Sequence, residues 1–270
     1  MGPDPRHSLS WRLRVALRRL ENRVGYVLRS PFVYRNWWAI ALPKLGVDTT
    51  LELRTGTRYR VRAGMLDLAA VNEAAFDDPY LRSNYVTISS DAVVVDVGAN
   101  IGDFAVRAAR LCPLGRVIAV EPMPLYGGMI ATQAKLNGLG NITWVSAALS
   151  GENGETTVGA IGSAYAVHGT PDQPVRLMTL ERLVQEHGLA RIDLLKLDCE
   201  GAEWEILPAA DLVLPLVRQI SMEYHCLHGW TPQKLAGWLR VRGFDVEHTP
   251  GHANGLLWAR RPALTPPFVR

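Results

Sequence analysis

The stretch of this chain best suited to chemistry is Ala92–Gly102, where an apolar run meets an acidic residue and small residues follow at alternate positions. Its letters are AVVVDVGANIG, with Asp96 ahead of Gly98, Asn100 and Gly102, and a helical pattern follows. Glycine is needed where a chain reverses beneath a ligand, because it has no Cβ and adopts conformations that other residues avoid. The stretch therefore predicts a strand, a tight turn and a helix whose first N–H groups face a ligand.

A second acidic residue, Glu121, ends the apolar run VIAVE and lies 19 residues after Gly102. At that distance from a glycine turn, a carboxylate that ends the second strand can hydrogen-bond the hydroxyls of a ribose. The two strands are therefore predicted to bind a nucleoside.

The spacing of the small residues indicates which nucleoside is bound. A dinucleotide fold requires G-x-G-x-x-G, whereas this chain has Gly98-x-Asn100-x-Gly102, with Asp96 two residues before the first glycine. A carboxylate at that position repels a pyrophosphate and attracts an ammonium group. We therefore expect S-adenosylmethionine as the cofactor. The alternatives are a nicotinamide dehydrogenase that binds NAD, and an ordinary turn that binds nothing.

A later string, K-x-D-x-E-G-x-E, begins at Lys196 within IDLLKLDCEGAEWEIL. Together with DVGANIG and VEP, it resembles the FkbM family of S-adenosylmethionine-dependent methyltransferases, over roughly Asp91 to Glu223. The resemblance implies O-methylation of a small-molecule hydroxyl acceptor, such as a saccharide, a glycolipid or a polyketide-like natural product. A non-catalytic module that binds S-adenosylmethionine or docks on a membrane is the rival from another class.

Methyl transfer to an alcohol needs the methyl donor and the oxygen held in line about 3 Å apart, and a group that takes the hydroxyl proton. His225 is the candidate base because its ordinary pKa lies near neutrality. A histidine that only hydrogen-bonds a loop is the alternative, and His228 is a second candidate. Lys196 could be a base or a substrate clamp, or could pair with Glu200 or Glu203.

Four carboxylates are each expected at the carboxyl end of a predicted strand, which predicts a lined crevice: Asp96, Glu121, Asp198 and Glu223. We assign Asp198 to the methionine amino group or the acceptor hydroxyl, and Glu200 to acceptor orientation or loop structure. A divalent cation between Asp198 and Glu223 is an alternative. The sequence offers no third ligand, so no metal site is predicted.

These assignments give two groups of candidate residues. The catalytic candidates are His225, Asp198, Lys196, Glu223 and Glu200. The cofactor-binding candidates are Asp96, Gly98, Ala99, Asn100, Gly102, Glu121, Pro122, Ala147, Ala148 and Asp198.

Strands that alternate with helices over residues 91–262 predict an α/β domain that carries this site. The expected fold is Rossmann-like, with a seven-stranded, mostly parallel sheet and helices on both faces. Later strands are expected at Ile142–Ala147, Ile192–Leu197 and Val217–Met222, before a terminal hairpin. Gly151–Thr179 is expected to be a hairpin over the cofactor, with its tip either a lid or an inert loop.

Residues 1–90 are expected to form an N-terminal region that covers the acceptor side of the site. A helix is predicted over Ser8–Ser30 and should end at Pro31. A hairpin is predicted over Leu51–Arg62, and a short helix over Asp67–Leu81.

The charge of this chain is unevenly distributed. Residues 1–36 hold eight arginines against Asp4 and Glu21, which gives +6 there while the whole chain carries +3. Residues 8–38 could therefore make a peripheral contact with an anionic membrane surface, or pack on the catalytic domain or a partner subunit. No nucleic acid is expected, because no recognised binding motif accompanies the arginines.

Composition sets the remaining expectations. A chain of 270 residues with 48% hydrophobic content can bury one full core and carry an appendage. It has no apolar window long enough to span a bilayer and no apolar signal segment, which predicts a cytoplasmic protein, or one peripheral at the inner membrane surface. Three cysteines without a C-x-x-C pair indicate reduced thiols. The sequence leaves open whether the chain forms a homo-oligomer.

Overall fold

The computed structural model describes residues 25–81, 85–157, 173–226, 229, 231–250 and 254–262. Contacts divide the chain into two compact units, Met1–Asp77 and Asp78–Arg270. Tyr80, Tyr85 and Val86 lie in the core of the larger unit, which therefore begins before the first strand of its sheet. The three cysteines are free.

The larger unit is built on a seven-stranded sheet of order β11-β12-β10-β9-β3-β4-β5. All pairs are parallel except those of β12, which runs antiparallel to β10 and β11. The predicted seven-stranded, mostly parallel sheet is confirmed, and β12 is its single antiparallel strand. The strands are β3 (Val93–Val97), β4 (Arg116–Val120), β5 (Ile142–Val145), β9 (Leu194–Leu197), β10 (Gln219–His225), β11 (Asp245–His248) and β12 (Asn254–Arg260).

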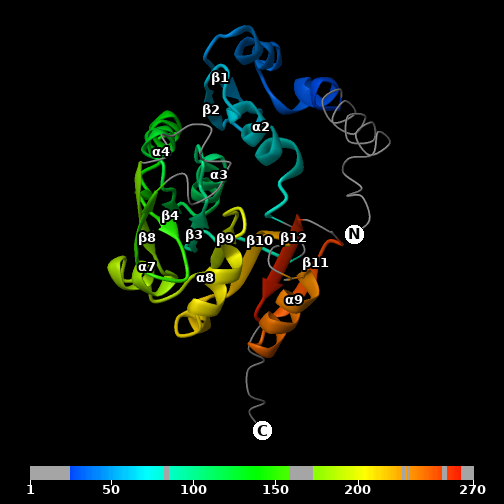
Figure 1. The fold of residues 1–270 in the computed structure, drawn as a ribbon. Coiled ribbons are helices and arrows are strands. Elements are labelled where there is room, and N and C mark those ends of the chain that lie inside the picture. The colour runs from blue at the N-terminus through cyan, green and yellow to red at the C-terminus, as the bar shows by residue number, and fades with distance from the viewer. Residues whose placement is uncertain are drawn as a thin grey trace, which may run out of the picture. The chain divides into compact units, whose positions relative to one another are not determined.

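Helices cover both faces of this sheet, because residues that alternate along β3 enter different apolar clusters. Val94 packs in a cluster with Phe104, whereas Val95 packs in the larger cluster with Leu183, Leu207 and Leu235. Figure 1 shows α8 and α9 together on one side of the strands. The helices are α3 (Asp103–Leu111), α4 (Pro124–Leu136), α7 (Leu180–Glu186), α8 (Glu203–Ala209) and α9 (Pro232–Val241).

Two features of the larger unit depart from the sequence expectations. Strand β10 does not end at Met222, because Glu223, Tyr224 and His225 continue the ladder with β12. Helix α8 follows β9 directly and was not expected. Both departures matter because they position His225 and Glu203.

The predicted inserted hairpin is present as part of a second sheet of order β6-β8-β7. Strands β7 (Gly154–Thr157) and β8 (Pro174–Met178) pair antiparallel, and β6 (Ala148–Leu149) pairs with β8. The tip of the hairpin, with the predicted lid, lies outside the described residues.

The smaller unit contains the predicted hairpin, formed by β1 (Thr49–Glu52) and β2 (Arg58–Val61). Residues 25–33 are helical, and η2 (Trp37–Leu45) follows as a 3-10 helix. Helix α2 (Asp67–Asn72) continues into η3 (Glu73–Asp77) as a π-helix. The helix predicted from Ser8 falls outside the described residues until residue 25.

The predicted helix end at Pro31 is wrong, since the helix continues to residue 33. Proline leaves the carbonyl four residues earlier without its helical donor. Here the Ser30 hydroxyl donates to the Val27 carbonyl at 2.7 Å and supplies the missing hydrogen bond.

Within the described residues, no helix of the chain is both long and apolar enough to cross a membrane.

Candidate functional site

The loop after β3 contains three residues in left-handed conformations, Gly98, Asn100 and Gly102, with φ of 72°, 48° and 83°. A Cβ on Gly98 would lie 1.8 Å from the backbone carbonyl oxygen of Asp198, at the end of β9. Glycine is therefore required here by the neighbouring strand end as well as by the turn. This close approach joins the loop to the residues that follow β9.

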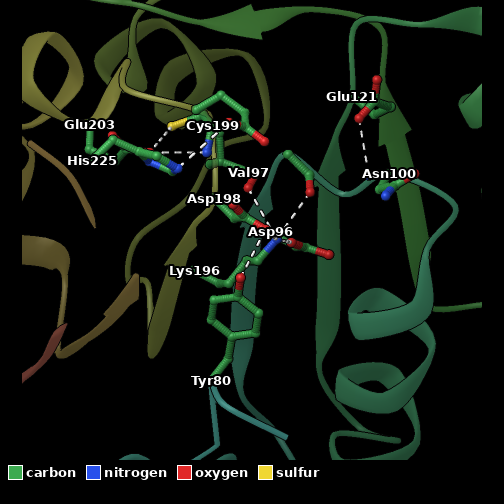
Figure 2. Close-up of polar contacts among 12 residues, drawn as sticks. Tyr80, Asp96, Val97, Asn100, Glu121, Lys196, Asp198, Cys199, Glu203 and His225 are labelled. Carbon is green, nitrogen blue, oxygen red and sulfur yellow. Dashed lines mark hydrogen bonds and ion pairs between the residues drawn. The ribbon is translucent and has the colours of Figure 1, made fainter. Parts of the chain in front are cut away.

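Glu121 follows β4, is completely buried and ties two loops together. Its Oε2 accepts a hydrogen bond from the Asn100 N–H at 3.0 Å (Figure 2). Its Oε1 accepts one from the Met123 N–H at 3.0 Å. Burial raises the pKa of Glu121 to about 8, although the two N–H donors oppose that shift. Each carboxylate oxygen has the capacity to accept one further hydrogen bond.

A polar row crosses the buried face of three neighbouring strands. The register places Asp96 on β3 beside Lys196 on β9, and Lys196 beside Ser221 on β10. Lys196 Nζ lies 3.1 Å from Asp96 Oδ1 and donates to the Gly98 carbonyl at 3.0 Å. Asp96 is completely buried and lies within β3, one residue before its end, rather than at the tip. The ammonium therefore links the buried acid to the glycine loop.

Asp198 and Tyr80 complete the surroundings of Lys196, as Figure 2 shows. The Tyr80 hydroxyl donates to Asp198 Oδ2 at 2.8 Å, and Lys196 Nζ lies 3.8 Å from the same oxygen and 5.0 Å from the Tyr80 ring centroid. The Asp198 side chain is 31% exposed, so this acid is within reach of a ligand. Tyr80 was not anticipated, because nothing near it in the sequence indicates which strand end it meets.

Electrostatics make Lys196 unsuitable as a proton acceptor. Burial alone lowers the pKa of Lys196, but the Asp96 and Asp198 carboxylates outweigh burial and raise it overall. Burial also raises the pKa of Asp96, and Lys196 partly opposes that rise. The pairing of Lys196 with Glu200 or Glu203, offered by the sequence as an alternative, is not what the structure has.

A second polar cluster surrounds His225 at the end of β10. Its Nδ1 lies 3.3 Å from Glu203 Oε1, and its Nε2 lies 3.6 Å from Glu200 Oε2 (Figure 2). The hydrogen bond and charge of Glu203 raise the pKa of His225 to about 9, against an opposing effect of burial. The Trp204 indole donates to the His225 carbonyl and fixes this strand end against α8.

Glu203 was not among the predicted site residues, yet it organises this second cluster. Its Oε1 also accepts hydrogen bonds from the Cys199 N–H and the Gly201 N–H, each at 3.2 Å, and from the Cys199 thiol at 3.6 Å. Glu200 has a left-handed φ of 55° in the same loop. One buried carboxylate therefore fixes both the loop after β9 and the His225 ring. Its place in the E-G-x-E string was the available signal.

Glu223 lies inside β10, two residues before its end, so it does not stand at a strand tip as expected. Its Oε1 accepts a hydrogen bond from the Asn254 side chain on β12 at 2.8 Å. The described residues contain no group of three or more His, Cys, Asp or Glu side chains suited to a metal ion. His228 lies outside the described residues.

The remaining cofactor candidates lie at or beside the same edge of the sheet. Ala99 and Pro122 are buried next to Gly98 and Glu121. Ala147 is buried in the larger apolar cluster, and Ala148 begins β6. Contact of these residues with a cofactor stays a prediction.

Comparison with known proteins bears on the sequence and on the fold. The family model described as the methyltransferase FkbM domain matches residues 96–246. The AMB antimetabolite synthetase AmbE of Pseudomonas aeruginosa is 32% identical over 247 residues, which cover 74% of this chain and 12% of that protein. The chain thus spans only a small part of that synthetase.

Two further proteins are similar over most of this chain. The 31-O-demethyl-FK506 methyltransferase FkbM of Streptomyces tacrolimicus is 28% identical over 239 residues, 74% of this chain and 90% of that protein. The crystal structure of methyltransferase FkbM from Methylobacillus flagellatus superposes with a TM-score of 0.52 at 14% identity, over 71% of this chain and 53% of that one. The latter likeness concerns the fold.

Proposed function

The chain belongs to the FkbM methyltransferase family, and we propose that it uses S-adenosylmethionine to methylate a hydroxyl of a saccharide, glycolipid or polyketide-like small molecule. The observation that carries the proposal is the placement of two clusters on either side of the loop after β9. One cluster, Asp96, Lys196 and Asp198, lies under the glycine loop. The other contains His225, a group able to take a proton.

The charges at the glycine loop suit this cofactor. Asp96 and Asp198 bring two carboxylates to a region whose ammonium is Lys196. A site with more acids than cations favours the positively charged S-adenosylmethionine and disfavours the pyrophosphate of NAD. When bound, S-adenosylmethionine supplies a methyl group made electrophilic by its sulfonium.

Three sets of residues would hold the cofactor. Asp198, the partly exposed acid of the cluster, is suited to accept hydrogen bonds from its ammonium group. Glu121 has acceptor capacity left for a ribose hydroxyl. The loop Gly98–Gly102, held to the end of β9 by close backbone contact, would lie against the nucleoside.

His225 is the residue we assign to the acceptor proton. Glu203 engages Nδ1, which leaves Nε2 as the nitrogen that takes the proton from the attacking hydroxyl. The imidazolium so formed is stabilised by the Glu203 carboxylate. Because the pKa of His225 is raised to about 9, most of the ring is protonated at neutral pH, and proton removal should become more effective as pH rises toward that value.

The choice of a hydroxyl acceptor rests on the name of one relative, a 31-O-demethyl-FK506 methyltransferase, and on the presence of a base. An alcohol needs help in losing its proton, whereas a softer nucleophile such as a thiolate does not. A non-catalytic module that only binds the cofactor has no use for a histidine held in this way.

The test is a screen for transfer of a labelled methyl group from S-adenosylmethionine to glycosides, glycolipids and macrolides, with wild type and His225→Gln. We expect at least one hydroxyl compound to be labelled by the wild type, and labelling to fall about 10²-fold or more in the variant. Label that appears only on amines or thiols, or labelling that His225→Gln leaves unchanged, would refute the assignment.

A further inference from the structure

A concentration of exposed apolar side chains marks the smaller unit. Eight of the fourteen large apolar side chains that are exposed among the described residues lie between Val27 and Leu66. The six in the larger unit are spread over six separate helices, strands and loops. The eight are Val27, Leu28, Phe32, Trp37, Trp38, Leu45, Val47 and Leu66.

Aromatic side chains dominate the most prominent part of this set. Phe32, 80% exposed, lies one helical turn after Leu28 and therefore shares its face. The 3-10 helix η2 then presents Trp37 and Trp38 to solvent near its start and Leu45 at its end. Its buried side, with Ala39 and Ile40, packs into the unit, so the exposed tryptophans are held on an ordered element.

The charge of the same segment has one sign. No aspartate or glutamate occurs between Glu21 and Asp48, whereas Arg23, Arg29, Arg35 and Lys44 do. Arg29, Arg35 and Lys44 are exposed. Arg35 also forms an ion pair with Glu52 of β1 at 3.3 Å. Tryptophan and phenylalanine next to an excess of exposed cations match an interface of acyl chains and anionic headgroups, because the rings enter the boundary and the cations meet phosphates.

We propose that residues 25–47 form a docking surface for an anionic phospholipid membrane, with Phe32, Trp37 and Trp38 as its inserted side chains. The surface binds peripherally, and the net charge of +6 over residues 1–36 favours an anionic membrane over a neutral one. Binding is stronger at low salt, because exposed charges are screened as ionic strength rises. This inference is independent of the reaction proposed above.

The experiment is sedimentation of the full chain with phosphatidylcholine vesicles that contain either no phosphatidylglycerol or about one third of it. We expect the wild type to bind to the anionic vesicles only. The triple variant Phe32→Ala/Trp37→Ala/Trp38→Ala should partition onto these vesicles at least tenfold more weakly, because it loses three apolar side chains that insert into the membrane. Lys44→Glu should weaken binding to a smaller extent. Leu114→Ala/Leu212→Ala, which removes two side chains of the larger unit that are about as exposed as Phe32, is the control and should bind as wild type does.

Several results would overturn the proposal. Equal binding to neutral vesicles, or no binding at all, would remove the anionic membrane as the occupant. Unchanged binding of the triple variant would assign the contact to residues outside 25–47. Self-association that the triple variant abolishes, in the absence of vesicle binding, would make a second copy of the chain the occupant. Circular dichroism of each variant shows that the comparison is between folded proteins.

Discussion

The two cations of the site, Lys196 and His225, are each held between carboxylates, yet solvent reaches them to different degrees. The Lys196 side chain is 4% exposed and lies in the middle of the sheet, whereas that of His225 is 17% exposed and lies at the end of a strand. Lys196 also donates to a backbone carbonyl of the glycine loop. The contacts of Lys196 therefore suit it to holding the loop, while His225, the residue we propose as proton acceptor, is the more exposed of the two.

The carboxylates differ in the same way. Asp96 is completely buried next to the glycine loop. Among the described side chains near it, Lys196 alone balances its charge. Glu203 is equally buried but accepts from two backbone N–H groups, a thiol and the His225 ring. A buried acid with one partner depends on that partner, whereas an acid with several partners tolerates the loss of one.

The largest effect should follow from Lys196→Met. The substitution leaves Asp96 buried without its partner, so the free energy of unfolding should fall by about 3–5 kcal/mol. Urea denaturation measures the loss, and Lys196→Met/Asp96→Asn should recover part of it. Lys135→Met, on the exposed face of α4, is the control. If Lys196→Met lowered the free energy of unfolding as little as this control does, Lys196 and Asp96 would not be coupled.

Gly98→Ala should come next. The new Cβ would meet the Asp198 carbonyl oxygen at 1.8 Å in a residue with φ of 72°, so the unfolding free energy should fall by about 2–4 kcal/mol. Cofactor affinity should weaken in the same variant. Gly128→Ala in α4 has open space around its Cβ and should leave stability unchanged or raise it by about 0.5–1 kcal/mol. Equal effects of the two substitutions would mean that the loop does not press on β9.

Glu203→Gln should shift the titration of His225. We expect the pKa of His225 to fall from about 9 toward its ordinary 6.5, because the largest cause of its rise is removed. NMR titration of the imidazole measures this without a methyl acceptor. Glu200→Gln is the control, since Glu200 is half exposed and farther from the ring, and it should lower the pKa less. A larger effect of Glu200→Gln would reverse the roles of the two acids.

The same pairing predicts a pH dependence of stability. The pKa of His225 is higher in the folded chain, about 9, than its ordinary value of 6.5, so folding takes up a proton between these values. The stabilisation is complete below about pH 6.5 and is lost as pH rises through about 9, and it amounts to about 1–3 kcal/mol. Glu121 also titrates in this range, because its pKa is raised to about 8, and it affects wild type and Glu203→Gln alike. The difference in unfolding free energy between the two proteins, followed from pH 6 to pH 9.5, therefore measures the contribution of His225. A difference that does not change with pH would contradict the prediction.

Tyr80→Phe should have the smallest effect. It removes the hydrogen bond to Asp198 and keeps the ring over Lys196, so stability should fall by about 0.5–1.5 kcal/mol. Thermal unfolding measures the change. A loss as large as that of Lys196→Met would mean that the Tyr80 hydroxyl, and not the ion pair, holds the cluster together.

Local patterns predicted the elements of the larger unit well. The apolar run before Gly98 and the turn residues after it specify strand, turn and helix through side-chain size alone. The pair Thr231-Pro232 is likewise typical of a helix start, and α9 begins there, with the Thr231 hydroxyl accepting a hydrogen bond from the Lys234 N–H. These features depend on neighbours in the chain, which is why the sequence reveals them.

The pairing of site residues could not be predicted in this way. Lys196 contacts Asp96 because β9 lies beside β3 in a particular register. The residues of neither strand specify which strand will be its neighbour in the sheet. The extension of β10 to His225 depends on the length of β12, which follows it along the chain. Pro31 failed to end its helix because the Ser30 hydroxyl replaced a backbone donor. Contacts between residues far apart in the sequence are determined by the three-dimensional arrangement of the strands and helices, so they are seen only in the structure.

The most direct measurement is a calorimetric titration of the purified chain with S-adenosylmethionine, S-adenosylhomocysteine and NAD, in wild type and Gly98→Ala. The account predicts one site per chain for both sulfur compounds, no heat with NAD, and weakened binding in the variant. Binding of NAD in place of the sulfur compounds, or no binding of any of the three to folded wild type, would contradict it.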